Sequence, residues 1–129
     1  MVTKKREFGD FGENIAESYL QSKGYKIHDR NYRIKNIGEI DIVGTKRERI
    51  TFFEVKTRDV KHETLFPIQT SINEKKKRNL KKICQFYLMD KYGDQPKEWQ
   101  VDAIFIEINK ETGSKNVNHL ENILWEEYY

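Results

Sequence analysis

The stretch GEIDIVGTKRERITFFEVKTR, residues 38–58, decides the fold. Its two runs, GEIDIVG and ITFFEVKTR, are rich in β-branched and aromatic residues and are separated by the polar TKRER, which predicts a β-hairpin. Four charged residues nevertheless interrupt the apolar runs: Glu39, Asp41, Glu54 and Lys56. Charges inside an apolar hairpin need partners, because an uncompensated buried charge is strongly unfavourable.

Strand alternation suggests where these charges meet. Side chains alternate across a strand, so Glu54 and Lys56 share one face of the second run. An antiparallel register that pairs Val43 with Phe52 places Asp41 opposite Glu54 on that face. A shift of one residue would move Asp41 to the other face, and the loop length leaves that shift open. In the predicted register, two carboxylates face each other and require a cation or a proton between them.

Two interpretations of these charges remain open. In the first, they form surface cross-strand pairs such as Glu39 with Lys56, each contributing about 0 to 1 kcal/mol. In the second, Asp41 and Glu54 are partly buried and bind a divalent metal. Oxygen ligands alone suit Mg²⁺ or Mn²⁺, and Lys56 could orient a water molecule or neutralise developing negative charge. This second arrangement fits hydrolysis of a phosphate ester.

Length and composition restrict the number of domains, the class of protein and the cellular setting. The 129 residues predict a single domain, 1–129, and 36% hydrophobic residues argue against disorder. The net charge of +3 permits a nucleic-acid partner without establishing one. Cys84 is the only cysteine, so no internal disulfide can form and a cytoplasmic setting is expected. No apolar run is long enough to span a membrane, and the N-terminal MVTKKREFGDFGE lacks an apolar stretch for export.

The remaining elements follow from hydrophobic periodicity. Glu13 lies at the margin of the apolar arc of the first helix, beside Leu20, where it could face a site. The expected elements are a helix over 8–23, one or two strands over 25–34, a loop over 59–66, a long helix over 68–91, a strand over 99–108, and a last strand with a helical piece over 117–129.

The chain resembles a known family in nearly its whole length. The resemblance rests on FGDFGENIAESYL followed by GY, then RNYR, GEIDIV, FFEVKTR, FPIQTSINEKKKRNL, VDAIFI and NHLENIL, in that order and spacing. These motifs are similar to those of the small bacterial UPF0102 proteins, also called the YraN family, which are assigned to the restriction-endonuclease-like PD-(D/E)XK superfamily.

That resemblance implies an α/β fold with a central mixed β-sheet flanked by helices, and a metal-dependent nuclease site like that of archaeal Holliday-junction resolvases. It assigns Asp41 and Glu54 as ligands of Mg²⁺ or Mn²⁺, Lys56 as the catalytic lysine, Glu13 as a further acidic group and Gln69 as a glutamine near the site. The expected substrate is DNA, including branched DNA. A homodimer would match related enzymes that cut two strands. The alternative is a nucleic-acid-binding module of the same fold with little or no cleavage activity.

Residues 74–82, EKKKRNLKK, surround the predicted long helix with positive charge. The residues expected to contact DNA phosphates are Lys75, Lys76, Lys77, Arg78, Lys81 and Lys82. A solvated helix face is the alternative interpretation. Asp102 is interpreted as structural, and the three histidines, which show no metal-ligand spacing, are expected to have packing or surface roles.

Overall fold

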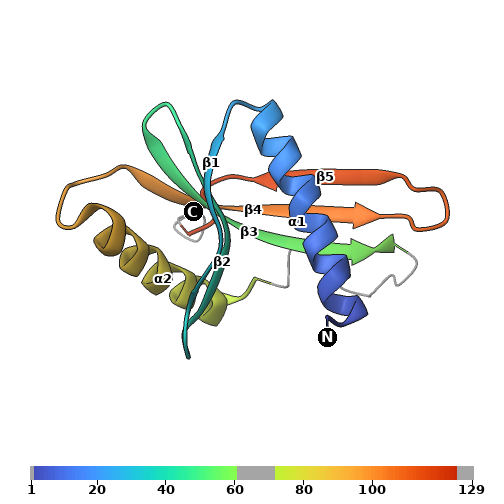
Figure 1. Ribbon diagram of the computed structural model, residues 1–129, viewed down its shortest axis with the longest axis horizontal. Helices are drawn as coiled ribbons and strands as arrows, with labels where there is room; N and C mark the ends of the chain where they lie inside the picture. Colours follow the sequence, from blue (N-terminus) through green and yellow to red (C-terminus); the bar gives the residue numbers. More distant parts are fainter. Residues whose placement is uncertain (1, 61–71, 125–129) are drawn as a thin grey trace.

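The structure, a computed structural model, describes residues 2–60 and 72–124 and consists of a five-stranded mixed sheet with one helix on each face (Figure 1). The α/β class expected from the sequence is therefore confirmed, and the architecture is compatible with a restriction-endonuclease-like fold. The elements are α1 (Lys4–Ser22), β1 (Lys26–Ile34), β2 (Gly38–Lys46), β3 (Arg49–Asp59), α2 (Glu74–Tyr92), β4 (Trp99–Ile108) and β5 (Lys115–Leu120).

The strands lie in the order β1-β2-β3-β4-β5, and of these four neighbouring pairs only β3–β4 is parallel. A parallel pair requires a crossover connection, and the segment containing α2 supplies it. In the hairpin, Val43 pairs with Phe52, which confirms the register predicted from the sequence. The last pair of this ladder is Ile42 with Phe53, so Asp41 and Glu54 occupy the next position, just beyond the paired residues.

Strand pairing on the other side of β2 is also irregular near Asp41. Arg30 pairs with Ile42 and Tyr32 with Ile40, and Asn31 between them has a positive φ of 55°. Asparagine tolerates this left-handed conformation better than most residues. Asp41 therefore lies where regular pairing is interrupted towards both neighbouring strands, and its side chain is available to a pocket.

The two helices bury opposite faces of the sheet. Ala16 and Leu20 of α1 pack against one apolar cluster, and Leu80 and Ile83 of α2 pack against the other. The approach of α1 depends on Gly12, because a Cβ at this position would lie 1.8 Å from Oγ1 of Thr57. This close contact fixes the turn of α1 that carries the neighbouring Glu13 over β3.

Several element boundaries differ from the predicted ones. Helix α1 begins at Lys4 because the Thr3 side chain accepts a hydrogen bond from the Arg6 backbone N–H. Helix α2 begins at Glu74, where Asn73 caps it, so residues 72 and 73 of the helix expected over 68–91 are not helical, and residues 68–71 lie outside the described part. The strand over 99–108 is confirmed. The last strand starts two residues before 117, and residues 125–129 of the expected helical piece lie outside the described part.

No helix in the described part of the chain has the length and apolar character needed to cross a membrane.

Candidate active site

A pocket of about 440 Å³ opens where α1, β2, β3 and the start of α2 meet. Its acidic lining residues are Asp10, Glu13, Glu39, Asp41 and Glu54. Its basic lining residues are Lys5, Arg6, Lys56 and Lys76. The four residues that the sequence assigned to catalysis within the described ranges, Glu13, Asp41, Glu54 and Lys56, are therefore brought together in one place.

Asp41 and Glu54 form the buried centre of this pocket, with only 6% and 3% of their surfaces exposed. Oδ2 of Asp41 accepts a hydrogen bond from the backbone N–H of Val55 at 2.8 Å. Burial, and then the charge of Glu54, raise the pKa of Asp41 to about 8. These carboxylates are therefore not a surface pair, and the first interpretation, that of surface cross-strand pairs, is wrong for them.

Two lysines from different elements, one in β3 and one in α2, compensate the negative charge of Glu54. Nζ of Lys56 lies 3.5 Å from Oε1 of Glu54, and Nζ of Lys76 lies 3.0 Å from the same oxygen. Burial lowers the pKa of Lys76, but the charge and hydrogen bond of Glu54 outweigh it, so this pKa is raised overall. Lys76 thus lies inside the pocket, whereas the sequence suggested only that it contacts DNA phosphates.

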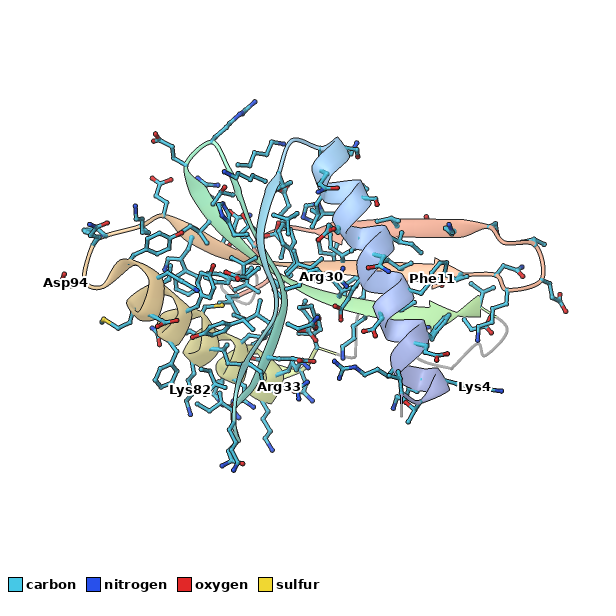
Figure 2. The ribbon with its side chains drawn as sticks, in the orientation of Figure 1. Lys4, Phe11, Arg30, Arg33, Lys82 and Asp94 are labelled. Carbon is cyan, nitrogen blue, oxygen red and sulfur yellow. The ribbon has the colours of Figure 1, made fainter. Side chains whose placement is uncertain are left out.

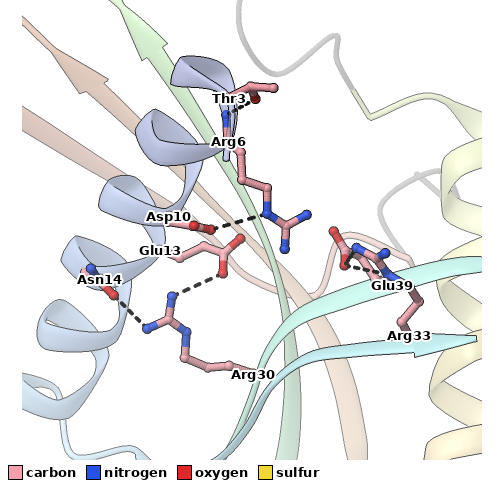
Figure 3. Close-up of polar contacts among 8 residues, drawn as sticks. All are labelled: Thr3, Arg6, Asp10, Glu13, Asn14, Arg30, Arg33 and Glu39. Atoms are coloured by element: carbon pink, nitrogen blue, oxygen red, sulfur yellow. Dashed lines mark hydrogen bonds and ion pairs between the residues drawn. The ribbon is translucent and has the colours of Figure 1, made fainter. Parts of the chain in front are cut away.

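Glu13 reaches the pocket from α1, as the sequence predicted, but it is already paired (Figure 3). Nη2 of Arg30 donates to Oε1 of Glu13 at 3.2 Å, and Nη1 donates to Oδ1 of Asn14 at 2.7 Å. Burial raises the pKa of Glu13, although Arg30 opposes this effect. Arg30, which extends from β1 towards α1 (Figure 2), therefore fixes the position of the carboxylate.

The expected cross-strand pair of Glu39 with Lys56 is wrong. Glu39 lies opposite Arg33 in the β1–β2 ladder, and Nη2 of Arg33 donates to its Oε2 at 2.8 Å (Figure 3). The sequence pattern of the hairpin does not show that Glu39 pairs with Arg33 of β1 and not with Lys56 of β3. Lys56 is consequently left to Glu54 and to the pocket.

The donor atoms fit a hard divalent cation. Within residues 2–60 and 72–124, Asp41 uses Oδ2 and Glu54 uses Oε1, and neither Oδ1 nor Oε2 has a partner. Mg²⁺ is commonly bound by one or two carboxylates and several waters, so two free carboxylate oxygens suffice. The repulsion between the two buried acids is also the kind that a cation relieves.

A second acidic cluster lies elsewhere on the sheet. Asp102 is fully buried and accepts hydrogen bonds from the Gln100 side chain at 2.8 Å and from the Asn122 backbone N–H at 2.9 Å. Nε2 of His119 lies 2.7 Å from its other oxygen. Asp102, His119 and Glu121 form the one group of three possible metal ligands found in the described part, with their donor atoms within 4.8 Å of one another. Asp102 does not line the candidate active site, and its structural role is supported.

The other predicted site residues fall into two groups. Gln69 lies outside the described residues, so its role stays a prediction. On α2, four predicted phosphate contacts are exposed to solvent, and Lys82 points away from the sheet (Figure 2). These four are Lys75, Arg78, Lys81 and Lys82. Lys77 is half-buried and lies 3.7 Å from Oε1 of Glu74.

Fold and pocket together define an α/β protein in which a mixed sheet carries two buried carboxylates and a lysine on adjacent strands. Comparison with known proteins identifies the family: residues 12–106 match the model of the uncharacterised protein family UPF0102, and the chain belongs to this family.

The individual relatives agree with this assignment. The chain is similar to UPF0102 proteins of Carboxydothermus hydrogenoformans, with 44% identity over 93% of this chain and 97% of that protein, and of Syntrophomonas wolfei, with 38% identity over 91% and 96%. A UPF0102 protein of Alkaliphilus oremlandii is 34% identical over 91% and 97%.

Proposed function

We propose that this protein is a nuclease dependent on Mg²⁺ or Mn²⁺ that hydrolyses phosphodiester bonds in DNA, including branched DNA. The observation that carries the proposal is the convergence of Asp41, Glu54 and Lys56 in one pocket, with both carboxylates buried. The likeness of GEIDIV and FFEVK to motifs of the PD-(D/E)XK superfamily supports the same assignment.

The residues have separate tasks in this proposal. Asp41 and Glu54 would hold the ion through Oδ1 and Oε2. A bound divalent ion would activate water and neutralise charge on the phosphate in the transition state. Lys56 would orient the attacking water or neutralise the developing negative charge. Glu13, held by Arg30, would add negative charge at the edge of the site.

Lys76 gives Glu54 a second cationic partner, and this partner is the closer one. When Lys56 turns to the substrate, Glu54 therefore retains a compensating ammonium group from α2. We infer that Lys76 is a positioning residue, which allows Lys56 to leave the carboxylate without exposing a buried charge.

The experiment is a comparison of DNA cleavage by the wild-type chain and by the Asp41→Ala and Lys56→Ala variants. Linear, single-stranded and four-way-junction DNA are each incubated with Mn²⁺ or with chelator. We expect wild-type cleavage that requires the metal and is lost in both variants. Cleavage that survives both substitutions would contradict the site assignment.

A second candidate is a nucleic-acid-binding module without cleavage. One observation favours it: the ammonium groups of Lys56 and Lys76 both pair with Glu54, so compensation of its charge does not require a metal ion. DNA binding without cleavage under every metal tested would select this candidate.

The cellular setting and assembly belong to the same proposal. The buried Cys84 thiol, with no second cysteine in the sequence, suits a reducing cytoplasm. Cutting two strands of a junction would require two sites, so we propose a homodimer for that substrate.

A further inference from the structure

Arg6 differs from the other arginines near the candidate active site. Arg30 and Arg33 both donate hydrogen bonds to carboxylates, with the shortest contact to each carboxylate at 3.2 and 2.8 Å. Among the described residues, the Arg6 side chain approaches only Asp10, and its Nε lies 4.0 Å from Oδ1, beyond hydrogen-bond distance. Within residues 2–60 and 72–124, its two Nη atoms have no partner. Arg6 therefore presents an unused guanidinium fork to the pocket.

The position of this fork is set by the first turn of α1. Thr3 caps the helix through the backbone N–H of Arg6, so the start of the helix is well defined. Figure 3 shows the Arg6 side chain extending from α1 towards the space between Glu13 and Glu39. The side chain is half exposed, which leaves it accessible to a ligand.

Positively charged side chains enter the pocket from both helices. Lys5 and Arg6 enter from the start of α1, and Lys76 enters from the start of α2. The two helices cover opposite faces of the sheet, so these cations bracket the buried Asp41 and Glu54. A ligand that carries several anionic groups along its length, and that extends past Asp41 and Glu54 in both directions, would meet positive charge at each end of the pocket.

We propose that Arg6 binds a backbone phosphate of the DNA strand that occupies the candidate active site; this inference rests on the proposed function. A guanidinium binds phosphate through two parallel N–H donors, which a lysine cannot do. Arg6, in the first turn of α1, then has a binding role that the sequence analysis did not give it. Arg6 and Lys76 hold the strand from opposite sides, and Asp41 and Glu54 lie between them.

The test measures binding of fluorescently labelled single-stranded and four-way-junction DNA by anisotropy, in chelator and over a series of salt concentrations. The variants are Arg6→Ala, Arg6→Lys and Lys4→Ala. Lys4 is the matched control because it lies in the same helical turn and points away from the pocket (Figure 2). Melting temperatures of all four proteins are recorded, and equal values show that the exposed substitutions leave the fold intact.

We expect Arg6→Ala to weaken DNA binding about tenfold and to reduce the salt slope by about 0.7 to 0.9. Arg6→Lys should recover part of the affinity, and Lys4→Ala should change it less than about twofold. Equal affinities of Arg6→Ala and wild type would overturn the role of Arg6 and leave the nuclease proposal standing. Equal losses in Arg6→Ala and Lys4→Ala would also overturn it, because net charge alone would then explain the binding.

A second readout separates this inference from the proposed function. The Arg6 Nε–H resonance is followed by NMR while inorganic phosphate is added to the wild-type chain. A saturable shift that the Arg6→Ala spectrum lacks supports a phosphate site even if the chain binds no DNA. Absence of the shift would overturn the phosphate role of Arg6, whereas the nuclease proposal is decided separately by the cleavage assay with Mn²⁺.

Discussion

Asp102 and Asp41 are two buried acids that differ in how their oxygens are used. Both oxygens of Asp102 have partners: Oδ1 accepts hydrogen bonds from Gln100 and Asn122, and Oδ2 lies beside Nε2 of His119. Asp41 uses one oxygen for a backbone N–H, its other oxygen has no partner among the described residues, and the residue lines the pocket. Burial alone therefore does not identify a functional acid. The distinguishing property is an unsatisfied oxygen beside a cavity, next to groups that compensate charge.

Substitution of Asp41 should have the largest effect on activity. Asp41→Asn keeps the shape of the side chain but removes the charge that would hold the ion. We expect cleavage to fall by about 100-fold or more, measured as the single-turnover rate with Mn²⁺. The fold should survive, since the amide oxygen can still accept from the Val55 N–H. Cleavage within about threefold of wild type would place the essential acid elsewhere.

Substitution of Asp102 should have the largest effect on stability. Asp102→Ala removes a fully buried acceptor and leaves the part-buried donors of Asn122 and Gln100, and the ring of His119, without their partner. We expect the free energy of unfolding to fall by about 3 to 5 kcal/mol, measured by urea denaturation. Asp41→Asn is the matched control and should cost far less. A stable Asp102→Ala protein would show that the two clusters are not distinguished by their hydrogen bonds.

The dependence of stability on pH sharpens the same contrast. In the metal-free chain, burial and Glu54 raise the pKa of Asp41 from 3.8 to about 8. The folded state therefore keeps a proton that the unfolded state loses, and stability falls as pH rises between these values. We expect this contribution to be on the order of 2 kcal/mol and to be absent in Asp41→Asn. Parallel urea-denaturation profiles for the two proteins from pH 5 to about 8 would contradict it.

Replacement of Lys76 should have the smallest of these effects. In Lys76→Met, Glu54 keeps only the more distant Lys56 as its partner. We expect Lys56 to stay paired with Glu54 and to be less available to the substrate. The cleavage rate at saturating DNA should therefore fall about tenfold, with KM little changed. Lys82→Met, on the exposed side of α2, should leave the maximal rate unchanged. If Lys76→Met raises only KM, Lys76 is a phosphate contact, as the sequence first suggested.

Much of the centre of the site could be predicted from the sequence because it lies on one hairpin. Alternation and the Val43–Phe52 register are local properties, and they bring Asp41 and Glu54 together without knowledge of the remaining fold. The strand over 99–108 was predictable for the same reason, since both of its faces are apolar. These features depend on short-range pattern.

The parts that the sequence could not provide depend on contacts between distant elements. Lys76 belongs to the site because α2 starts beside β3, and Arg6 because α1 starts at the same pocket. The hairpin pattern alone pairs Glu39 with Lys56, because it does not show that β1 brings Arg33 opposite Glu39. In each case the residue type was informative, and its partner was set by the tertiary arrangement.

In the proposed function, the Asp41–Glu54 pocket, and not the Asp102 cluster, would hold the divalent ion. The most direct measurement is a Mn²⁺ titration of the purified chain followed by electron paramagnetic resonance, with Asp41→Asn and His119→Ala variants. We predict one ion per chain for wild type and for His119→Ala, and loss of this binding in Asp41→Asn. Binding that persists in Asp41→Asn and disappears in His119→Ala would contradict the account.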